Sequence, residues 1–228
     1  MIKSMCFFFR QLSDAGTIAK RFKIIIEKSA DLVLSNEFNA FSHPECSVIT
    51  NDCPGIIQKA VWGLIPPRAK TPDIQKYTLN ARIESIVKKS SFKDSVENRC
   101  LVIADGFYEW KEEMVYGKRQ KIKHLICTSD GMPFAFAGLY SFSNTRFDNT
   151  NKKTFTILTT DANETVARIH SKNRMPVIIK PDDEEDWLNG SRYDRFAYPY
   201  SSDLIAVPLF DLNKTNKKGG NSLPSLFN

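Results

Sequence analysis

Four short segments of the sequence carry side chains that can do chemistry together. They are Met5-Cys6 near the start, TLNARIES around Asn80, ADGFYEW around Glu109 and IHSKNRMPVI around His170. A thiol is a nucleophile, a side-chain amide orients reacting groups, and a carboxyl and an imidazole transfer protons. Each residue also has an ordinary interpretation. A Cys before three Phe residues suits a buried strand, Asn80 suits a helix cap, and the other two suit solvent exposure and a helix end.

The composition favours a globular protein with an anionic partner. The chain has 228 residues, of which 42% are hydrophobic, and this is enough apolar material for a real core. Its formal net charge is +6 and its sequence pI is about 9.0. Such a charge suits nucleic acid through phosphate neutralisation, although many basic surfaces bind nothing in particular.

Neither a membrane span nor a metal centre is indicated. The sequence has no run of about 18 apolar residues, and its opening MIKSMCFFFRQL does not resemble a secretory signal, so we expect a cytoplasmic protein. Its five cysteines are an odd set without CxxC spacing, and it has three histidines. We therefore expect no disulfide framework, no metal and no cofactor.

The elements that must position these side chains follow from hydrophobic periodicity and turn residues. An amphipathic helix is expected over residues 14–30 with Asp14 as its cap, followed by a loop-rich stretch over 32–49 that ends as a strand. Residues 59–64 alternate like a strand. A loop and a short helix that begins near Asn80 come next.

The second half predicts mostly strands. Residues 100–110 read as a strand interrupted at Asp105-Gly106, and a hairpin tip is expected at Tyr116-Gly117. Further strands are expected at 124–129, 134–139, 154–159 and 177–179, and helices at 161–170 and 181–188. The tail from residue 211 has few apolar residues and is expected to be loose, above all over 214–228. We predict one α+β domain over 1–228 with a mixed or antiparallel sheet.

Taken in order, the four segments resemble the SRAP family, the SOS-response-associated peptidases that act as abasic-site crosslinkers. The resemblance also covers FNAFSHPECSVI (38–49), AVWGLIP (60–66), PFAFAGLY (133–140) and TILTTDAN (156–163), and so runs to about residue 213. It implies a barrel-like sheet core flanked by helices. It also implies a role in the DNA damage response, with abasic sites in single-stranded DNA as partner. We expect a monomer that joins the nucleoid at damaged DNA.

The implied chemistry depends on a free amine at Cys6. An abasic sugar opens to an aldehyde, which an α-amino group with a pKa of about 7.7–8.0 can attack to give an imine. The thiol of an N-terminal Cys then closes a thiazolidine ring. The resemblance implies that Asn80 positions the reacting groups and that Glu109 and His170 act as acid/base groups, a role commonly worth about 10²–10⁴-fold.

Five residues are expected to contact DNA. By the resemblance, Arg82 and Arg174 would bind phosphates beside the lesion. Phe8 would stack on a base or else fill core, and Trp62 and Arg68 belong to the segment WGLIPPR, where the family often carries a further Trp.

The chain departs from the family pattern at its start. The family commonly begins Cys-Gly-Arg, whereas Phe7 and Phe8 follow Cys6 here, and MIKSM precedes it. We favour translation from Met5 followed by Met removal. The alternative is cleavage of the Met5–Cys6 bond by the protein itself or by another peptidase. Two other functions stay open: non-covalent binding of single-stranded DNA, and a thiol peptidase acting on other proteins.

Overall fold

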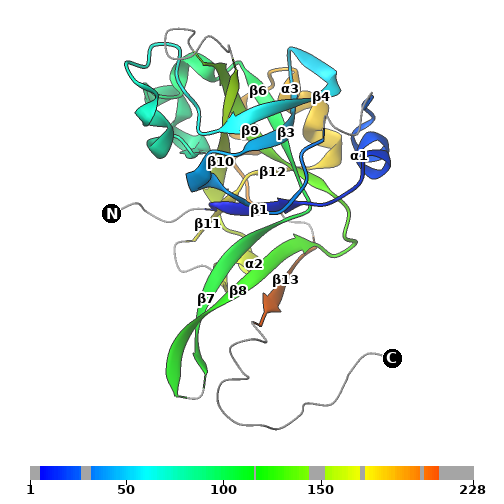
Figure 1. Ribbon diagram of the computed structural model, residues 1–228, viewed down its shortest axis with the longest axis vertical. Coiled ribbons are helices and arrows are strands. Elements are labelled where there is room, and N and C mark those ends of the chain that lie inside the picture. Colours follow the sequence, from blue (N-terminus) through cyan, green and yellow to red (C-terminus); the bar gives the residue numbers. More distant parts are fainter. Residues whose placement is uncertain are drawn as a thin grey trace.

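The computed structural model describes residues 6–26, 32–115, 117–143, 152–169, 173–200 and 203–210. Strands dominate it, and short helices lie around them (Figure 1). The predicted α+β class is confirmed. Residues 1–5 and the tail from 211 lie outside the described residues, so the expectations for them stay predictions.

Five strands close into a ring. They are β4 (Cys53–Trp62), β3 (Glu45–Thr50), β6 (Arg99–Ala104), β9 (Phe134–Phe142) and β10 (Lys153–Asp161), each hydrogen-bonded to the next, and β10 returns to β4. Four of the five contacts are antiparallel, and the closing contact is parallel, with Phe155 opposite Trp62. Closure removes exposed sheet edges and confirms the predicted barrel-like core. Three short strands extend the ring: β5 (Asn80–Arg82), β11 (Arg174–Pro176) and β12 (Ile178–Ile179).

A second sheet lies against one end of this barrel. Its order is β13 (Leu204–Leu209), β8 (Lys118–Thr128), β7 (Gly106–Val115), β1 (Phe8–Gln11) and β2 (Ser35–Asn39). The β7–β8 hairpin is long and extends away from the barrel, with β1 between the two (Figure 1). The predicted break at Asp105-Gly106 is the point where the chain passes from the barrel strand β6 to β7.

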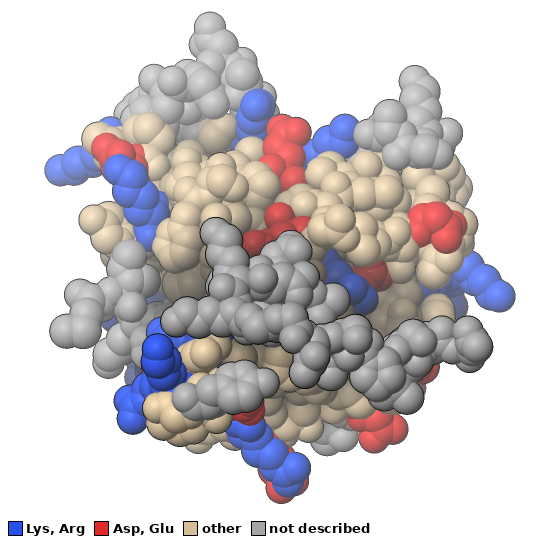
Figure 2. Space-filling model, turned by 60° about the horizontal axis from the view of Figure 1, so that its bottom comes forward, with Lys and Arg blue, Asp and Glu red and all other residues tan. Residues whose placement is uncertain are grey.

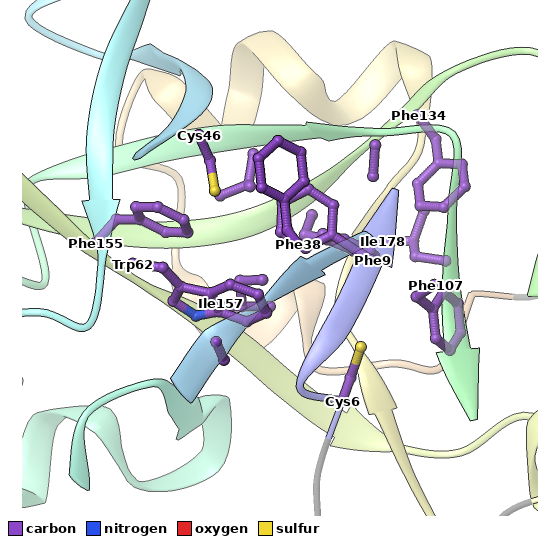
Figure 3. Close-up of a cluster of buried hydrophobic side chains, with 14 of the residues drawn as sticks. Cys6, Phe9, Phe38, Cys46, Trp62, Phe107, Phe134, Phe155, Ile157 and Ile178 are labelled. Carbon is purple, nitrogen blue, oxygen red and sulfur yellow. The ribbon is translucent and has the colours of Figure 1, made fainter. Parts of the chain in front are cut away.

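Alternation along the ring strands separates two hydrophobic clusters. Cys100 and Val102 of β6 belong to a cluster inside the barrel, whereas Leu101 and Ile103 face outward. The inner cluster contains aromatic rings from many elements, including Phe9, Phe38, Trp62, Phe107, Phe136 and Phe155 (Figure 3). Burying a side chain of this size stabilises the fold by roughly 1.5–3 kcal/mol. Gly138 is required here because an added Cβ would lie 2.6 Å from Cys100 Sγ.

Helices cover the outside of the barrel. α1 (Ala15–Phe22) buries Ile18 and α3 (Glu184–Leu188) buries Trp187, both in the outer cluster. Asp14 caps α1 as predicted, accepting a hydrogen bond from the Thr17 amide at 3.0 Å. The predicted helix over 14–30 is too long, because Lys23 takes a left-handed conformation with φ 55° and ends it. α2 (Glu164–Ala167) is likewise shorter than the expected helix over 161–170.

Short 3₁₀ helices make up much of the rest, at Ala40–Ser42, Pro72–Tyr77, Ile83–Lys88, Lys93–Ser95, Pro181–Asp183 and Tyr193–Phe196. The short helix expected to begin near Asn80 begins three residues later, as the 3₁₀ helix Ile83–Lys88. Asn80 begins β5, which pairs in parallel with β10 and places Asn80 opposite Ile157. The strand β2, in the stretch expected to be loop-rich, and the strand β11 were also missed. In each case pairing with a distant strand overrides the local pattern.

Candidate active site and DNA-contacting residues

Cys6 lies at the open edge of the inner cluster, two residues before β1. Pairing of β1 with β7, with Phe9 opposite Phe107, holds this segment against the barrel end. The Cys6 side chain is 1% exposed, and its sulfur points toward the cluster (Figure 3). The thiol donates to the Phe8 carbonyl oxygen at 3.5 Å. Cys6 is therefore fixed in place rather than carried on a loose end.

Asn80 is joined directly to Cys6. Its Nδ2 donates to the Cys6 carbonyl oxygen at 2.9 Å, although the two residues are 74 positions apart. The side chain is 6% exposed, and its Oδ1 has no hydrogen-bond partner within the described part of the chain. The same amide that orients Cys6 thus offers a buried acceptor beside it.

Glu109 faces the same end of the barrel from β7. It is 3% exposed and shares its strand face with Phe107, which belongs to the inner cluster. Burial raises the pKa of the Cys6 thiol well above its ordinary value, and the negative charge of Glu109 raises it further. The hydrogen bond to Phe8 works the other way and lowers the pKa. Cys6 is consequently held as a neutral thiol.

His124 is a neighbour of Glu109 that the sequence analysis did not single out. It lies directly opposite Glu109 in the β7–β8 hairpin, is 5% exposed, and has Nδ1 3.0 Å from the Ile122 carbonyl oxygen. Directly opposed residues of an antiparallel pair share a face with Cβ atoms about 4.5–5.5 Å apart. The predicted hairpin tip at Tyr116-Gly117 could have identified this pairing. Counting seven residues outward from each side of the tip places residue 109 opposite residue 124.

Asp105 of the ADGFYEW segment has a structural role that was also missed. Its carboxylate accepts hydrogen bonds from the Leu12 and Ser13 amides and from the Ser13 hydroxyl. Its own amide donates to the Arg10 carbonyl oxygen at 2.9 Å. This clamp ties the exit of β1 to the β6–β7 junction and so fixes the segment that carries Cys6.

His170 lies outside the described residues, so its expected acid/base role stays a prediction. The chain reaches it from α2, whose cap Asn163 accepts a hydrogen bond from the Val166 amide at 2.9 Å. The described chain resumes at Asn173 and enters β11 next to β10.

Arg82 and Arg68 are both exposed, and their expected contacts with DNA stay predictions. Arg82 ends β5, two residues beyond Asn80, and is exposed. Arg68 has a side chain that is 84% exposed, and its Nε lies 3.7 Å from Asp94 in a weak ion pair. Arg68 lines a surface hollow that also contains the basic residues Lys70 and Lys93.

The structure corrects the expectations for Arg174 and Trp62. Arg174 is 7% exposed, and its guanidinium donates to Glu84 at 2.7 Å, to Asp161 at 2.8 Å and to the Thr159 carbonyl at 2.6 Å. These bonds occupy the group that would bind phosphate. Trp62 is 0% exposed and donates from Nε1 to the Leu79 carbonyl at 2.7 Å, so its ring is core rather than a surface for a base.

Phe8 has an intermediate position. It is half-buried, with its ring centroid 5.1 Å from that of Trp110 and 6.5 Å from that of Phe41. Neither the core interpretation nor the DNA interpretation is excluded by this placement. The role of Phe8 toward DNA stays a prediction.

Among the described residues on the face drawn in Figure 2, charge alone does not mark a binding site. Lys and Arg side chains are scattered in Figure 2, with acidic and uncharged residues between them. Within the described ranges no group of three or more His, Cys, Asp or Glu residues is arranged to hold a metal ion. None of the described helices is long and apolar enough to cross a membrane.

Comparison with known proteins identifies the family of this chain. The family described as SOS response associated peptidase (SRAP) matches residues 5–207. The abasic site processing protein YoqW of Bacillus subtilis is 39% identical over 163 residues, covering 69% of this chain and 70% of the relative. The abasic site processing protein HMCES of Gallus gallus is 32% identical over 149 residues, covering 56% of this chain and 44% of that protein.

A solved structure of a protein from Bacteroides thetaiotaomicron has the same fold. It superposes with a TM-score of 0.80 at 29% identity, covering 93% of this chain and 95% of the other. The range that the family matches covers most of the chain. The chain therefore belongs to the SRAP family.

Proposed function

We propose that this protein captures abasic sites in single-stranded DNA by forming a covalent thiazolidine link at Cys6. The observation that carries the proposal is the hydrogen bond from Asn80 Nδ2 to the Cys6 carbonyl oxygen, inside a site that also contains Glu109. Such a bond orients the main chain of Cys6, which is the part that a reacting amine needs held. The names of the relatives as abasic site processing proteins point to the same substrate.

The reaction balances without a cofactor. The Cys6 amine adds to the open-chain aldehyde of the abasic sugar, and loss of one water gives an imine. The Cys6 sulfur then adds to the imine carbon while the thiol proton passes to the nitrogen, which closes a five-membered ring. A new C–N bond and a new C–S bond form, and water is the sole leaving group.

The side chains divide the work. Asn80 positions Cys6 through its Nδ2, and in this proposal its Oδ1 accepts a hydrogen bond from the reacting amine. Glu109 carries protons to the leaving water, helped by His170, a role commonly worth about 10²–10⁴-fold. Because the Cys6 pKa is raised, the sulfur attacks as a thiol that gives up its proton during ring closure. Arg82 and Arg68 hold the phosphates.

This chemistry requires a form of the protein in which Cys6 has no residue before it. Either translation starts at Met5 and that Met is removed, or the Met5–Cys6 bond is cleaved by the protein itself or by another peptidase. Intact mass of protein expressed with its natural start region shows whether Cys6 becomes the first residue, because loss of everything through Met5 exposes its amine. Retention of MIKSM would identify an unreactive form.

The decisive experiment incubates protein that begins at Cys6 with single-stranded DNA containing one abasic site. A DNA adduct that survives denaturation is expected for the wild type and for the control Cys53→Ala, whose thiol is half-exposed and lies at the start of β4. No such adduct is expected for Cys6→Ala. An adduct that persists in Cys6→Ala, or is absent from the wild type, would refute the proposal. In the latter case, salt-sensitive binding would favour a non-covalent binder, and turnover of unrelated peptides a thiol peptidase.

A further inference from the structure

A row of aromatic rings begins one residue after Cys6. The Phe7 and Phe41 centroids are 4.7 Å apart with an interplanar angle of 44°. Phe8 continues the row, 6.5 Å from Phe41 and 5.1 Å from Trp110, both in edge-on contact. We call Phe7, Phe41, Phe8 and Trp110 the aromatic row. It joins the Cys6 segment, the 3₁₀ turn Ala40–Ser42 and β7.

The middle of this row is open to solvent. Phe41 is 50% exposed, and the other three rings are half-buried. A single exposed ring is ordinary, but contiguous apolar side chains at the surface mark interaction sites, and this row brings four rings together beside the reactive residue.

Phe41 is also held rigidly. The Ala40 amide donates to the Phe7 carbonyl oxygen at 2.9 Å, which ties the turn to the Cys6 segment. Asn39 Oδ1 accepts from the Phe41 amide at 3.0 Å. The main chain of Phe41 is therefore fixed relative to Phe7, and the contact between the two rings limits their rotation. Such pre-organisation lowers the entropic cost of binding.

We propose that the Phe7–Phe41 pair is a stacking site for the intact base next to the abasic nucleotide. This inference rests on the proposed function. The lesion lacks a base, so its neighbour loses a stacking partner and presents one uncovered face. Phe7 directly follows Cys6, and consecutive Cα atoms are about 3.8 Å apart. A lesion bonded to Cys6 therefore brings the adjacent intact base close to the aromatic row. Base–aromatic stacking is worth about 1–3 kcal/mol per base.

The site also defines a substrate class. A purine covers more of an aromatic ring than a pyrimidine does, so lesions flanked by a purine are the preferred substrates. Stacking carries no charge, and this preference is therefore expected to persist at salt concentrations that weaken the phosphate contacts.

The test is a double-mutant cycle between protein and DNA. Each oligonucleotide carries one reactive abasic site. In one series both neighbouring nucleotides are intact. In the others the neighbour on the 5′ or the 3′ side is replaced by a tetrahydrofuran analogue, which lacks a base and cannot open to an aldehyde. Adduct formation is followed for protein that begins at Cys6, and non-covalent affinity is measured in parallel with Cys6→Ala. Removing the base on one side is expected to weaken the wild type about 5- to 150-fold.

In Phe41→Ala, removal of the neighbouring base is expected to change the affinity and the rate of adduct formation less than twofold, because the ring on which the base would stack is already absent. Phe41→Leu keeps apolar bulk without a flat ring and is expected to behave like Phe41→Ala, whereas Phe41→Tyr retains the wild-type dependence. The control is Phe142→Ala, because Phe142 is 43% exposed at the end of β9 and its ring contacts Tyr140 rather than the aromatic row.

Full dependence on the neighbouring base in Phe41→Ala, or no dependence in the wild type, would overturn the inference. Adduct formation that ignores the neighbouring base would leave the proposed function intact. Absence of any adduct would refute the proposed function alone, because the non-covalent measurement still decides whether the row binds a base.

Discussion

The side-chain amide of Asn80 donates to the main-chain oxygen of Cys6 across 2.9 Å, and this bond links the barrel to the segment that carries the reactive residue. Asn80 begins a three-residue strand held in parallel beside β10, so its own position is set by the barrel. Cys6 in turn precedes β1, which is paired with β7. Asn80 and Cys6 are therefore in contact because the second sheet packs against the barrel, and their hydrogen bond lies where the two sheets meet.

Asn80→Asp keeps the size of the side chain but replaces the donor with an acceptor facing the Cys6 oxygen. Loss of this buried bond is expected to cost about 1–3 kcal/mol and to slow adduct formation about tenfold or more. The measurement is the rate of adduct formation together with Tm. The matched control is Asn51→Asp, because Asn51 Nδ2 also donates to a main-chain oxygen, that of Glu97, at 3.0 Å. A control that slows the reaction equally would assign Asn80 a role in stability only.

Glu109→Gln is expected to lower the pKa of the Cys6 thiol. Burial and the Glu109 charge both raise this pKa, so removal of the charge removes one cause and increases the thiolate fraction at a given pH. Alkylation of Cys6 by iodoacetamide, followed by peptide mass across a pH series, should shift to lower pH in the variant. Glu113→Gln, four residues along the same strand, should leave the Cys6 profile unchanged. An unchanged or upward shift in Glu109→Gln would contradict the assigned cause.

Arg174→Gln is expected to lower stability rather than DNA affinity. The change removes the bonds to Glu84 and Asp161 and leaves the Thr159 carbonyl without this donor, at a cost of about 1–3 kcal/mol. For a chain of this size the Tm falls by about 2–4 °C per kcal/mol. Arg195→Gln, whose ion pairs are exposed, is expected to cost less than about 1 kcal/mol. Weaker DNA binding with unchanged Tm in Arg174→Gln would restore the phosphate role.

Arg82→Gln is expected to weaken non-covalent binding of single-stranded DNA without regard to sequence. Loss of one phosphate contact should reduce the slope of log affinity against log salt by about 0.7. Fluorescence anisotropy titrations over a salt series measure this slope. Arg192→Gln is the control, because Arg192 is exposed and paired with Asp194 on another part of the surface. An equal slope in wild type and Arg82→Gln would remove Arg82 from the interface.

Local patterns in the chain were sufficient for many elements. Apolar runs predicted the barrel strands β6, β9 and β10, and glycine predicted the position of the tip between β7 and β8. The Asp14 cap of α1 was likewise readable. These features depend on residues close in sequence, because the spacing of apolar side chains and the conformational preferences of turn residues determine local structure.

Other features depended on contacts between distant segments. Asn80 has the composition of a helix start, yet parallel pairing with β10 makes it a strand. Arg174 and Trp62 have side chains typical of DNA contacts, yet the fold buries both. A side chain's exposure and partners are set by what packs over it, and that is not encoded in its neighbours along the chain.

The sequence by itself determined the family, the α+β class and the identity of Cys6, Asn80 and Glu109 as a group, because residue types in order are enough for recognition. Only the tertiary structure decided that Asn80 is bonded to Cys6, that Glu109 raises the Cys6 pKa and that His124 faces Glu109. The physical reason is that hydrogen bonds and electrostatic effects depend on distances of a few ångströms. Closure of the barrel and docking of the second sheet create those distances between residues that are far apart along the chain.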